Sequence, residues 1–397
     1  MKKLFVALLI MSGLLTVGRR ACAQAWATTS APVTNWEAVA SSADGSKLVA
    51  VVYTDGSGGG GPIFVSTDSG TNWTQTGAPL AEWDAVAASA DGSRLIAGAG
   101  FNNPGPVYTS TNSGATWISN NLPVALWGAV ASSGDGAKLA AGIQNGPIYI
   151  STNGGATWKL SGAPSQLWLN IASSADGTKL IAAAYFGLIY TSTDSGATWT
   201  PNVSTTNEFW RCVVSSADGT KLLAAAAYSG GSNPGPILTS TNGGVTWTPG
   251  AVTGYWASAA CSADGSRLAL GGAQGSGTLI STNFGATWIT NDVPQGALVG
   301  LASSADGGKL VGVVQRGNIY AWQTTIAPKL NSAPSGTNVR LSWIVPSTSF
   351  HLQKNLNPRT VNWSNEPAAF TLNPADLQNE AFLPHTNGSA FFRLAPN

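Results

Sequence analysis

Ser192-Thr193-Asp194-Ser195-Gly196-Ala197-Thr198-Trp199 decides the fold of this chain, because variants of it recur along the sequence. They share the consensus Ser-Thr-Asp/Asn-x-Gly-x-Thr-Trp and occupy Ser66–Trp73, Ser110–Trp117, Ser151–Trp158, Ser240–Trp247 and Ser281–Trp288. Each copy predicts a hairpin turn, in which the Asp or Asn side chain accepts hydrogen bonds from backbone N–H groups two residues on and the Gly takes a positive φ. Thr and Trp then begin the returning strand. We expect a structural role in these turns for Asp68, Asn112, Asn153, Asp194, Asn242 and Asn283.

A second motif, Ser-Ala-Asp-Gly-x-Lys/Arg-Leu, alternates with the first. Its acidic residues are Asp44, Asp91, Asp135, Asp176, Asp218, Asp264 and Asp306, which lie 41 to 47 residues apart. That period is typical of one four-stranded propeller blade, so seven Asp-Gly turns predict seven blades. In the first unit, strands are expected at Trp36–Ser41, Lys47–Tyr53 and Ile63–Ser66, and from Trp73 onward. The basic residue of each motif is interpreted as a surface partner of the Asp residues.

The two ends of the repeat array are complementary. The last unit has a third strand, Asn318–Trp322, but no following turn motif and no fourth strand. At the N-terminus, the segment from Ala25 to Pro32 resembles the segment that follows each turn, with Trp26 in the place of Trp158. We therefore expect the N-terminal strand to complete the last blade, which closes the ring and removes exposed edges.

The turn motif resembles the Asp-box of the BNR-repeat, sialidase-like propellers, and residues 26–325 resemble the seven-bladed members of that group. The resemblance implies a closed all-β propeller whose ligands sit on the face with variable loops, near the central channel. It implies little about chemistry, because one propeller fold supports lectins, hydrolases, lyases and scaffolds.

The regular period stops at Ile326. Residues 326–338 are rich in Ser, Pro and Ala and are interpreted as a linker. Residues 339–397 contain several short apolar runs and are predicted to form a small C-terminal β module. With its Leu-Ser-Trp start at Leu341 and its Phe-Phe-Arg-Leu end at Phe391, this module resembles the β-sandwich modules attached to many exported bacterial proteins.

Residues 1–25 have the pattern of a secretory signal: Lys2 and Lys3 precede an apolar run, and small residues follow it. The signal contains four of the 19 basic residues, so the mature chain has 15 against 18 acidic ones, a net charge of −3. Such a sparse and slightly acidic charge does not suit nucleic-acid binding. No other apolar stretch is long enough to span a membrane. We therefore expect an exported protein, and no cofactor or metal site is predicted.

Tryptophans recur eight residues before the repeat Asp: Trp36, Trp83, Trp127, Trp168, Trp210 and Trp256, with Leu298 in the last unit. Such a ring could form an aromatic collar for sugars, with Trp36, Trp83 and Trp210 nearest to the charged residues described next. The alternative, which we favour, is that these side chains pack between blades, because a residue repeated in every blade usually serves the blade.

One residue further along, the identity changes with every blade: Glu37, Asp84, Gly128, Leu169, Arg211, Ala257 and Val299. Glu37 and Asp84 are equivalent positions in adjacent blades, with Glu82 nearby in sequence, and Glu208 precedes Arg211. These charged residues are the candidate ligand-binding residues of the variable face. A pair of carboxylates could also serve as acid and base in glycoside cleavage, with Glu37, Asp84 or Glu82 as the catalytic candidates.

Several enzyme classes are excluded by composition. Residues 26–325 contain no His, which rules out a Ser-His-Asp triad and a His-ligated zinc site on the propeller. A sialidase of the resembled group would need three substrate-binding arginines, and in residues 26–325 only Arg211 and Arg316 lie outside the repeated basic position. The loops are short and glycine-rich, which favours a flat binding face over a deep catalytic cleft. We therefore predict a non-catalytic propeller that binds a glycan or a protein, with a polysaccharide-active enzyme as the alternative.

Overall fold

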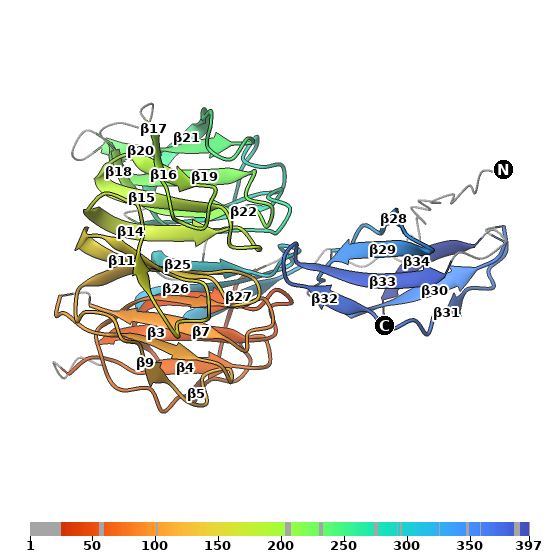
Figure 1. Ribbon diagram of the computed structural model, residues 1–397, viewed down its shortest axis with the longest axis horizontal. Coiled ribbons are helices and arrows are strands. Elements are labelled where there is room, and N and C mark those ends of the chain that lie inside the picture. Colours follow the sequence, from red (N-terminus) through yellow and green to blue (C-terminus); the bar gives the residue numbers. More distant parts are fainter. Residues whose placement is uncertain are drawn as a thin grey trace.

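The computed structural model describes residues 25–396, except 55–58, 101, 203–207, 230–232, 274–276, 292, 294–295, 325, 347–348, 358 and 385–389. The predicted signal lies outside these residues, apart from Ala25. All regular structure in the described residues is β-strand, and the chain forms a propeller followed by a smaller β module (Figure 1). The described part of the chain has no helix that could cross a membrane. The predicted all-β propeller fold is confirmed.

Successive units of four antiparallel strands follow one another along the chain, and each unit corresponds to one period of the repeat. The first three units contain β2 (Thr34–Ser41), β3 (Leu48–Thr54), β4 (Ile63–Ser66) and β5 (Thr74–Gln75); β6 (Trp83–Ala88), β7 (Leu95–Ala99), β8 (Val107–Ser110) and β9 (Ile118–Ser119); and β10 (Trp127–Ser132), β11 (Leu139–Gly146), β12 (Ile148–Ser151) and β13 (Lys159–Leu160). The fourth unit contains β14 (Gln166–Ser173), β15 (Leu180–Gly187), β16 (Ile189–Ser192) and β17 (Thr200–Asn202). The fifth unit contains β18 (Glu208–Ser215), β19 (Leu222–Ser229), β20 (Asn233–Ser240) and the first part of β21 (Thr248–Cys261), which pairs with β20. The second part of β21 belongs to the sixth unit, together with β22 (Leu268–Ala273), β23 (Thr278–Ser281) and β24 (Ile289–Thr290).

The last unit combines the two ends of the array. It consists of β25 (Leu298–Ser303), β26 (Lys309–Gly317), β27 (Ile319–Gln323) and β1 (Ala27–Thr28). Strand β1 pairs antiparallel with β27, with Ala27 opposite Ala321. The indole of Trp26 is buried in the same unit and donates a hydrogen bond to the Asn291 carbonyl at 2.9 Å. Closure of the ring by the N-terminal strand is confirmed.

The Asp-Gly turns are joined in a closed circle by backbone hydrogen bonds. In each turn the residue before the Asp donates its N–H to the carbonyl of the corresponding residue in the next turn, at 2.6 to 2.8 Å. The circle runs through Ala43, Ala90, Gly134, Ala175, Ala217, Ala263 and Ala305 and returns to Ala43. Small residues are needed here because the seven turns converge on the propeller axis.

The basic residues of the repeat act between neighbouring blades. The side-chain stem of each packs over the Gly of the next blade's turn, as Lys47 does over Gly92. Three of the ammonium groups donate to the backbone carbonyl of the Asp in that turn, in the pairs Lys179–Asp218, Lys221–Asp264 and Lys309–Asp44. The expected attraction to the Asp carboxylates is present as well, since the charge of Lys309 lowers the pKa of Asp44 and that of Lys47 lowers the pKa of Asp91.

The turn motif quoted first has a tighter hydrogen-bond network than the sequence suggested. Asp194 accepts from the Thr198 N–H at 2.8 Å and from the Thr198 hydroxyl at 2.6 Å, four residues on rather than two. The N–H two residues on, that of Gly196, donates instead to the Ser192 hydroxyl at 2.9 Å. Both Ser195 and Gly196 have positive φ. The role of Asp194 in this turn is structural. The bond from the Thr N–H recurs in the copies with Asn, where the Asn amide donates to the Thr hydroxyl instead of accepting from it.

Replacing Asp194 by Ala removes these bonds and is expected to lower the free energy of unfolding by about 1 kcal/mol, the usual net worth of such a hydrogen bond. Asp194→Asn is the matched control, because Asn occupies the equivalent position in four other turns and keeps the bond to the Thr198 N–H. Chemical denaturation of the variants measures the difference. An Asp194→Asn variant as unstable as Asp194→Ala would contradict this account.

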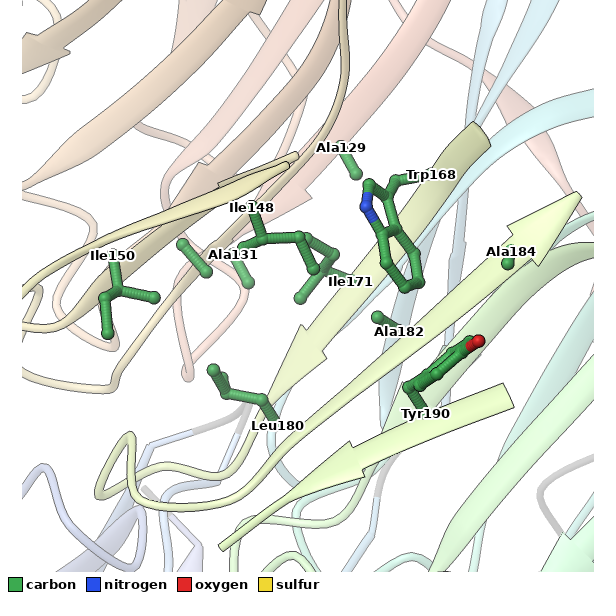
Figure 2. Packing of buried hydrophobic residues seen from close by; sticks show 11 residues of the cluster. Ala129, Ala131, Ile148, Ile150, Trp168, Ile171, Leu180, Ala182, Ala184 and Tyr190 are labelled. Atoms are coloured by element: carbon green, nitrogen blue, oxygen red, sulfur yellow. The ribbon is translucent and has the colours of Figure 1, made fainter. Parts of the chain in front are cut away.

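Large side chains fill the spaces between neighbouring blades. The six repeat tryptophans and Leu298 are at most 1% exposed. Figure 2 shows one such cluster, in which Trp168 of β14 packs with Ala129 and Ile148 of the preceding blade and with Ile171 of its own strand. The tryptophans are therefore interblade core residues, as we favoured from their repetition.

The C-terminal module is built from two sheets around one core. One sheet has the order β28 (Asn331–Ser335), β29 (Asn338–Ile344), β33 (Gln378–Pro384) and β32 (Thr371–Asn373), and the other has β31 (Ser364–Asn365), β30 (Phe350–Asn355) and β34 (Phe391–Pro396). Leu341, Trp343 and Leu352 from the two sheets share the core. Strand β28 lies within 326–338, so much of the predicted linker belongs to the module. Its Ser-Pro composition is tolerated because β28 is an edge strand.

Candidate functional site

An axial chamber opens toward the loop face of the propeller, with a volume of about 140 Å³. We define it by the residues that follow the buried tryptophans and Leu298. They are Glu37, Asp84, Gly128, Leu169, Arg211, Ala257 and Val299, and all of them line the chamber. The structure therefore brings together Glu37, Asp84 and Arg211, three of the predicted site residues.

A β-bulge explains why these particular residues face the axis. In the innermost strand of every blade the pairing register shifts across this one position, for example between Trp36 and Ala38 and between Trp83 and Ala85. The extra residue of a bulge is released from the ladder, and its side chain is redirected. The blade therefore keeps its tryptophan in the core, while the next residue can differ from blade to blade without disturbing the core. The residues at this position can therefore determine which ligand the chamber binds.

Glu37 is the least satisfied charged group of the chamber. Its side chain is only 6% exposed, and Oε1 lies 3.8 Å from Nη2 of Arg211, whose side chain is 36% exposed. Oε2 is buried and has no hydrogen-bond partner among the described residues. Burial raises the pKa of Glu37 above its usual range, and the charge of Arg211 opposes this rise.

Asp84 accepts a hydrogen bond from a residue of the neighbouring blade. Gln144 of β11 donates from Nε2 to Oδ2 of Asp84 at 2.8 Å. Gly128 makes room for this contact, because a Cβ there would lie 2.7 Å from Cγ of Gln144. Burial, assisted by the charge of Glu37, raises the pKa of Asp84 to about 7, although Arg211 and the Gln144 hydrogen bond act in the opposite direction. Asp84 therefore exchanges a proton near neutral pH.

The other predicted site residues lie outside the chamber. Glu82 accepts the backbone N–H groups of Asn102 and Asn103, each at 3.1 Å, and so fixes a loop on the surface. It does not join Glu37 and Asp84, because it precedes the bulge and points to the loop. Glu208 lies at the outer end of β18, opposite Gly187 of the neighbouring blade, and does not line the chamber.

Ligand contact by Trp36, Trp83 and Trp210 was an expectation that does not fit the structure. All three side chains are completely buried between blades. A sugar could reach them only if neighbouring blades separated, so they support the chamber wall from behind instead of contacting a ligand.

An aromatic arc on the loop face was not predicted from the sequence. It consists of Tyr185, Phe186, Phe209, Tyr228 and Tyr255 from the fourth, fifth and sixth units, with consecutive ring centroids 3.9 to 5.8 Å apart. Phe186 is 66% exposed and has a φ of +58°, a conformation rarely adopted by a bulky residue. Aromatic residues are enriched in protein interfaces relative to the rest of the surface.

The opposite mouth of the channel is covered by the C-terminal module. Val345, Ile344, Leu372 and Leu377 of the module pack on Ala43 and its equivalents in the circle of turns. Leu377 also lines a second axial cavity of about 150 Å³ on that side. Figure 1 shows the module beside this face of the propeller. The loop face is consequently the side from which a ligand has access to the axial chamber.

Comparison with known proteins supports the fold. The family model of the BNR/Asp-box repeat matches residues 149–160. The chain is similar to the solved structure entitled "YCF48 bound to D1 peptide", with 16% identity, 75% of this chain and 96% of that chain covered, and a TM-score of 0.56. It is also similar to hydrazine synthase of Kuenenia stuttgartiensis, with 15% identity, coverage of 74% and 97%, and a TM-score of 0.60. For YCF48 from Cyanidioschyzon merolae the identity is 16%, the coverage 75% and 98%, and the TM-score 0.56. No curated protein sequence matches the chain significantly.

No group of three or more His, Cys, Asp or Glu residues that could hold a metal ion occurs among the described residues. The two cysteines of the described propeller, Cys212 and Cys261, are both unpaired thiols. Burial raises the pKa of Cys212, which lines the chamber, to about 12, so this thiol stays neutral. The polar side chains that line the chamber are the carboxyl groups of Glu37 and Asp84, the guanidinium group of Arg211, the Asn170 amide, the Ser258 hydroxyl and the Cys212 thiol.

Proposed function

We propose that this chain is an exported, non-catalytic propeller that binds a polypeptide partner on its loop face. The single observation that carries the proposal is that an axial chamber and an aromatic arc share the loop face, while the C-terminal module covers the opposite face of the propeller. One of the similar structures is described by its title as bound to a peptide, which is consistent with such use of the fold. Export rests on the N-terminal signal pattern and predicts a secreted product that lacks it.

A polypeptide suits this surface better than a polysaccharide does. The chamber is too small for more than one side chain or one sugar ring, and the aromatic groups of the loop face form one short arc of five rings in mutual contact. Extended peptides are commonly bound by side-chain anchoring in a pocket with aromatic contacts around it. The C-terminal module would then serve to close the channel and to stiffen the circle of turns.

A polysaccharide-active enzyme is the second candidate, and one observation favours it. Asp84 has a pKa of about 7 beside the carboxylate of Glu37, which is the kind of arrangement that an acid and base pair requires. Glu82 takes no part in this candidate, because it is bound to the loop at Asn102 and Asn103. Release of reducing ends from a polysaccharide, abolished by Asp84→Asn, would support the enzyme in place of the binding protein.

The test is a screen of the secreted protein on peptide and glycan arrays, with reducing-end release measured for every glycan that binds. We expect binding to peptides, and at least tenfold weaker binding by a Phe186→Asn variant, a loss of the size seen for aromatic anchor residues. Asn is chosen because Asn145 occupies the corresponding turn of the preceding blade with a φ of +58°, so the backbone is preserved. Val245→Ala, a change at an exposed apolar residue on the opposite face, is the control and should have no effect. Binding to glycans alone would refute the proposal.

A further inference from the structure

We infer that the axial chamber is a binding site for a single organic cation, an alkylammonium or guanidinium group on a slender stem, which forms its ion pair with Glu37. The inference deepens the proposed function, on which it rests for the identity of the natural ligand: a Lys or Arg side chain of the polypeptide partner. The site itself can be tested with small cations that need no partner protein.

The unpaired oxygen of Glu37 is the first argument. A buried carboxylate normally has both oxygens hydrogen-bonded or paired, because an unsatisfied charge in the interior is costly. Here Arg211 is 3.8 Å from Oε1, beyond hydrogen-bonding distance, and Oε2 has no partner among the described residues although it is buried. A cation with several N–H donors would satisfy both oxygens of this carboxylate.

The sign of the ligand follows from the charges around the chamber. The ionisable groups that line it are Glu37, Asp84, Arg211 and the neutral thiol of Cys212. With both carboxyl groups ionised the chamber carries a net charge of −1, which repels an anion. Arg211 remains partly exposed and can be hydrated, so the charged group that lacks a hydrogen-bond partner is the buried carboxylate of Glu37.

The size and position of the chamber limit the ligand to one group at the end of a narrow stem. A volume of about 140 Å³ accommodates an ammonium or guanidinium group with a few methylenes, but not a folded element. Val299, Leu169 and Ala257 give the remaining wall an apolar surface that suits methylene groups. The exposed ring of Phe186 on the loop face could then contact the chain that carries the cation.

Cation binding should be coupled to release of the Asp84 proton. The pKa of this carboxyl group is about 7, raised by burial and by Glu37, and Arg211 is the positive group that opposes the rise. A cation binds the ionised form more tightly, so its affinity should increase as pH rises through 7 and level off above it. For a group with this pKa the ionised fraction changes about tenfold between pH 6 and pH 8, which sets the expected change in affinity.

The experiment measures binding of methylguanidinium and n-butylammonium to the purified protein by NMR titration at pH 6 and pH 8. Butyrate and n-butanol serve as the anionic and neutral analogues. Calcium and sodium ions, added as their chlorides, are tested as inorganic cations. We expect one of the two organic cations to bind about tenfold more tightly at pH 8, and the analogues not to bind. The better of the two cations identifies the partner side chain as Arg or Lys.

Three variants locate the site. Glu37→Gln keeps the shape of the side chain and should weaken binding at least tenfold, while Asp84→Asn should remove the difference between pH 6 and pH 8. Glu82→Gln is the matched control, a carboxylate of the same face that lies outside the chamber, and should bind as the parent protein does. Folding of each variant is verified by its melting temperature.

The outcomes separate this inference from the proposed function. Cation binding that depends on Glu37, in a protein that binds no peptide, would support the site and refute the polypeptide partner. Peptide binding that is lost in Phe186→Asn but unchanged in Glu37→Gln, with no binding of either organic cation, would overturn the cation site alone. Binding of calcium or sodium in place of both organic cations would also overturn it.

Discussion

Deleting residues 26–32 is expected to destabilise the whole propeller by at least about 4 kcal/mol, the largest effect of any change considered for this chain. Loss of a buried Trp side chain alone typically costs about 3 to 5 kcal/mol, and Trp26 is only 5% exposed. The deletion also removes the pairing of β1 with β27 and uncovers Tyr320 and Trp322 of the last blade. The last blade would then lack its outer strand, and β27 would present an unpaired edge.

Thermal unfolding followed by circular dichroism measures this effect, with a chain that starts at Ala25 as the reference. Trp26→Ala in the full-length protein should reproduce most of the loss, because it removes the side chain while leaving β1 in place. Equal melting temperatures for the deletion and the reference would show that the N-terminal strand does not hold the ring together.

The closed ring could be predicted from the sequence because its determinants are local and repeated. The Asp-Gly turns fix the period, and the likeness of the Trp26 segment to the Trp158 segment identifies the missing strand. Each is a property of a few neighbouring residues whose turn chemistry is well defined. The same reasoning failed for 326–338, where a Ser-Pro composition does not distinguish a linker from an edge strand such as β28.

The composition of the site could be predicted only in part, since it depends on a backbone irregularity. The positions of Glu37, Asp84 and Arg211 in the repeat indicated that they are equivalent, and the structure places all three in one chamber. The bulge that directs them to the axis has no residue signature, so Glu82, two residues before Asp84, seemed equally suitable. Its real partners, Asn102 and Asn103, are in a loop whose path the sequence does not reveal.

The aromatic arc could not be found by a search for repeats, because it is made of residues that break the repeat. Tyr185 and Phe186 lie near the end of β15, Phe209 near the start of β18 and Tyr228 near the end of β19, whereas Tyr255 lies within the long strand β21. Only the geometry of adjacent blades brings the five rings together. Attention to non-repeated aromatic residues at the strand ends of the loop face would have been the useful signal.

Replacing Trp168 by Ala is expected to lower the free energy of unfolding by about 3 to 5 kcal/mol, the usual cost of emptying a site filled by a large aromatic side chain. Trp168 is fully buried, and its indole N–H donates to the Gly146 carbonyl at 3.0 Å. Its ring meets that of Tyr190 edge-on, with centroids 5.3 Å apart, so the replacement also leaves Tyr190 without its neighbour. Neither blade can collapse into the gap, because both are held in the closed ring.

This substitution also decides between the two roles considered for the repeat tryptophans. An interblade core residue affects stability first, whereas a member of a sugar-binding collar affects ligand affinity and leaves the melting temperature nearly unchanged. Trp199→Ala is the control within the same blade, since Trp199 is only half-buried on the turn side and should cost clearly less. Denaturant unfolding of both variants gives the two free energies. Trp168→Ala with the stability of the parent protein would mean that the space between the blades is not a packed core, and the collar would then return as the better explanation of why Trp recurs at this position.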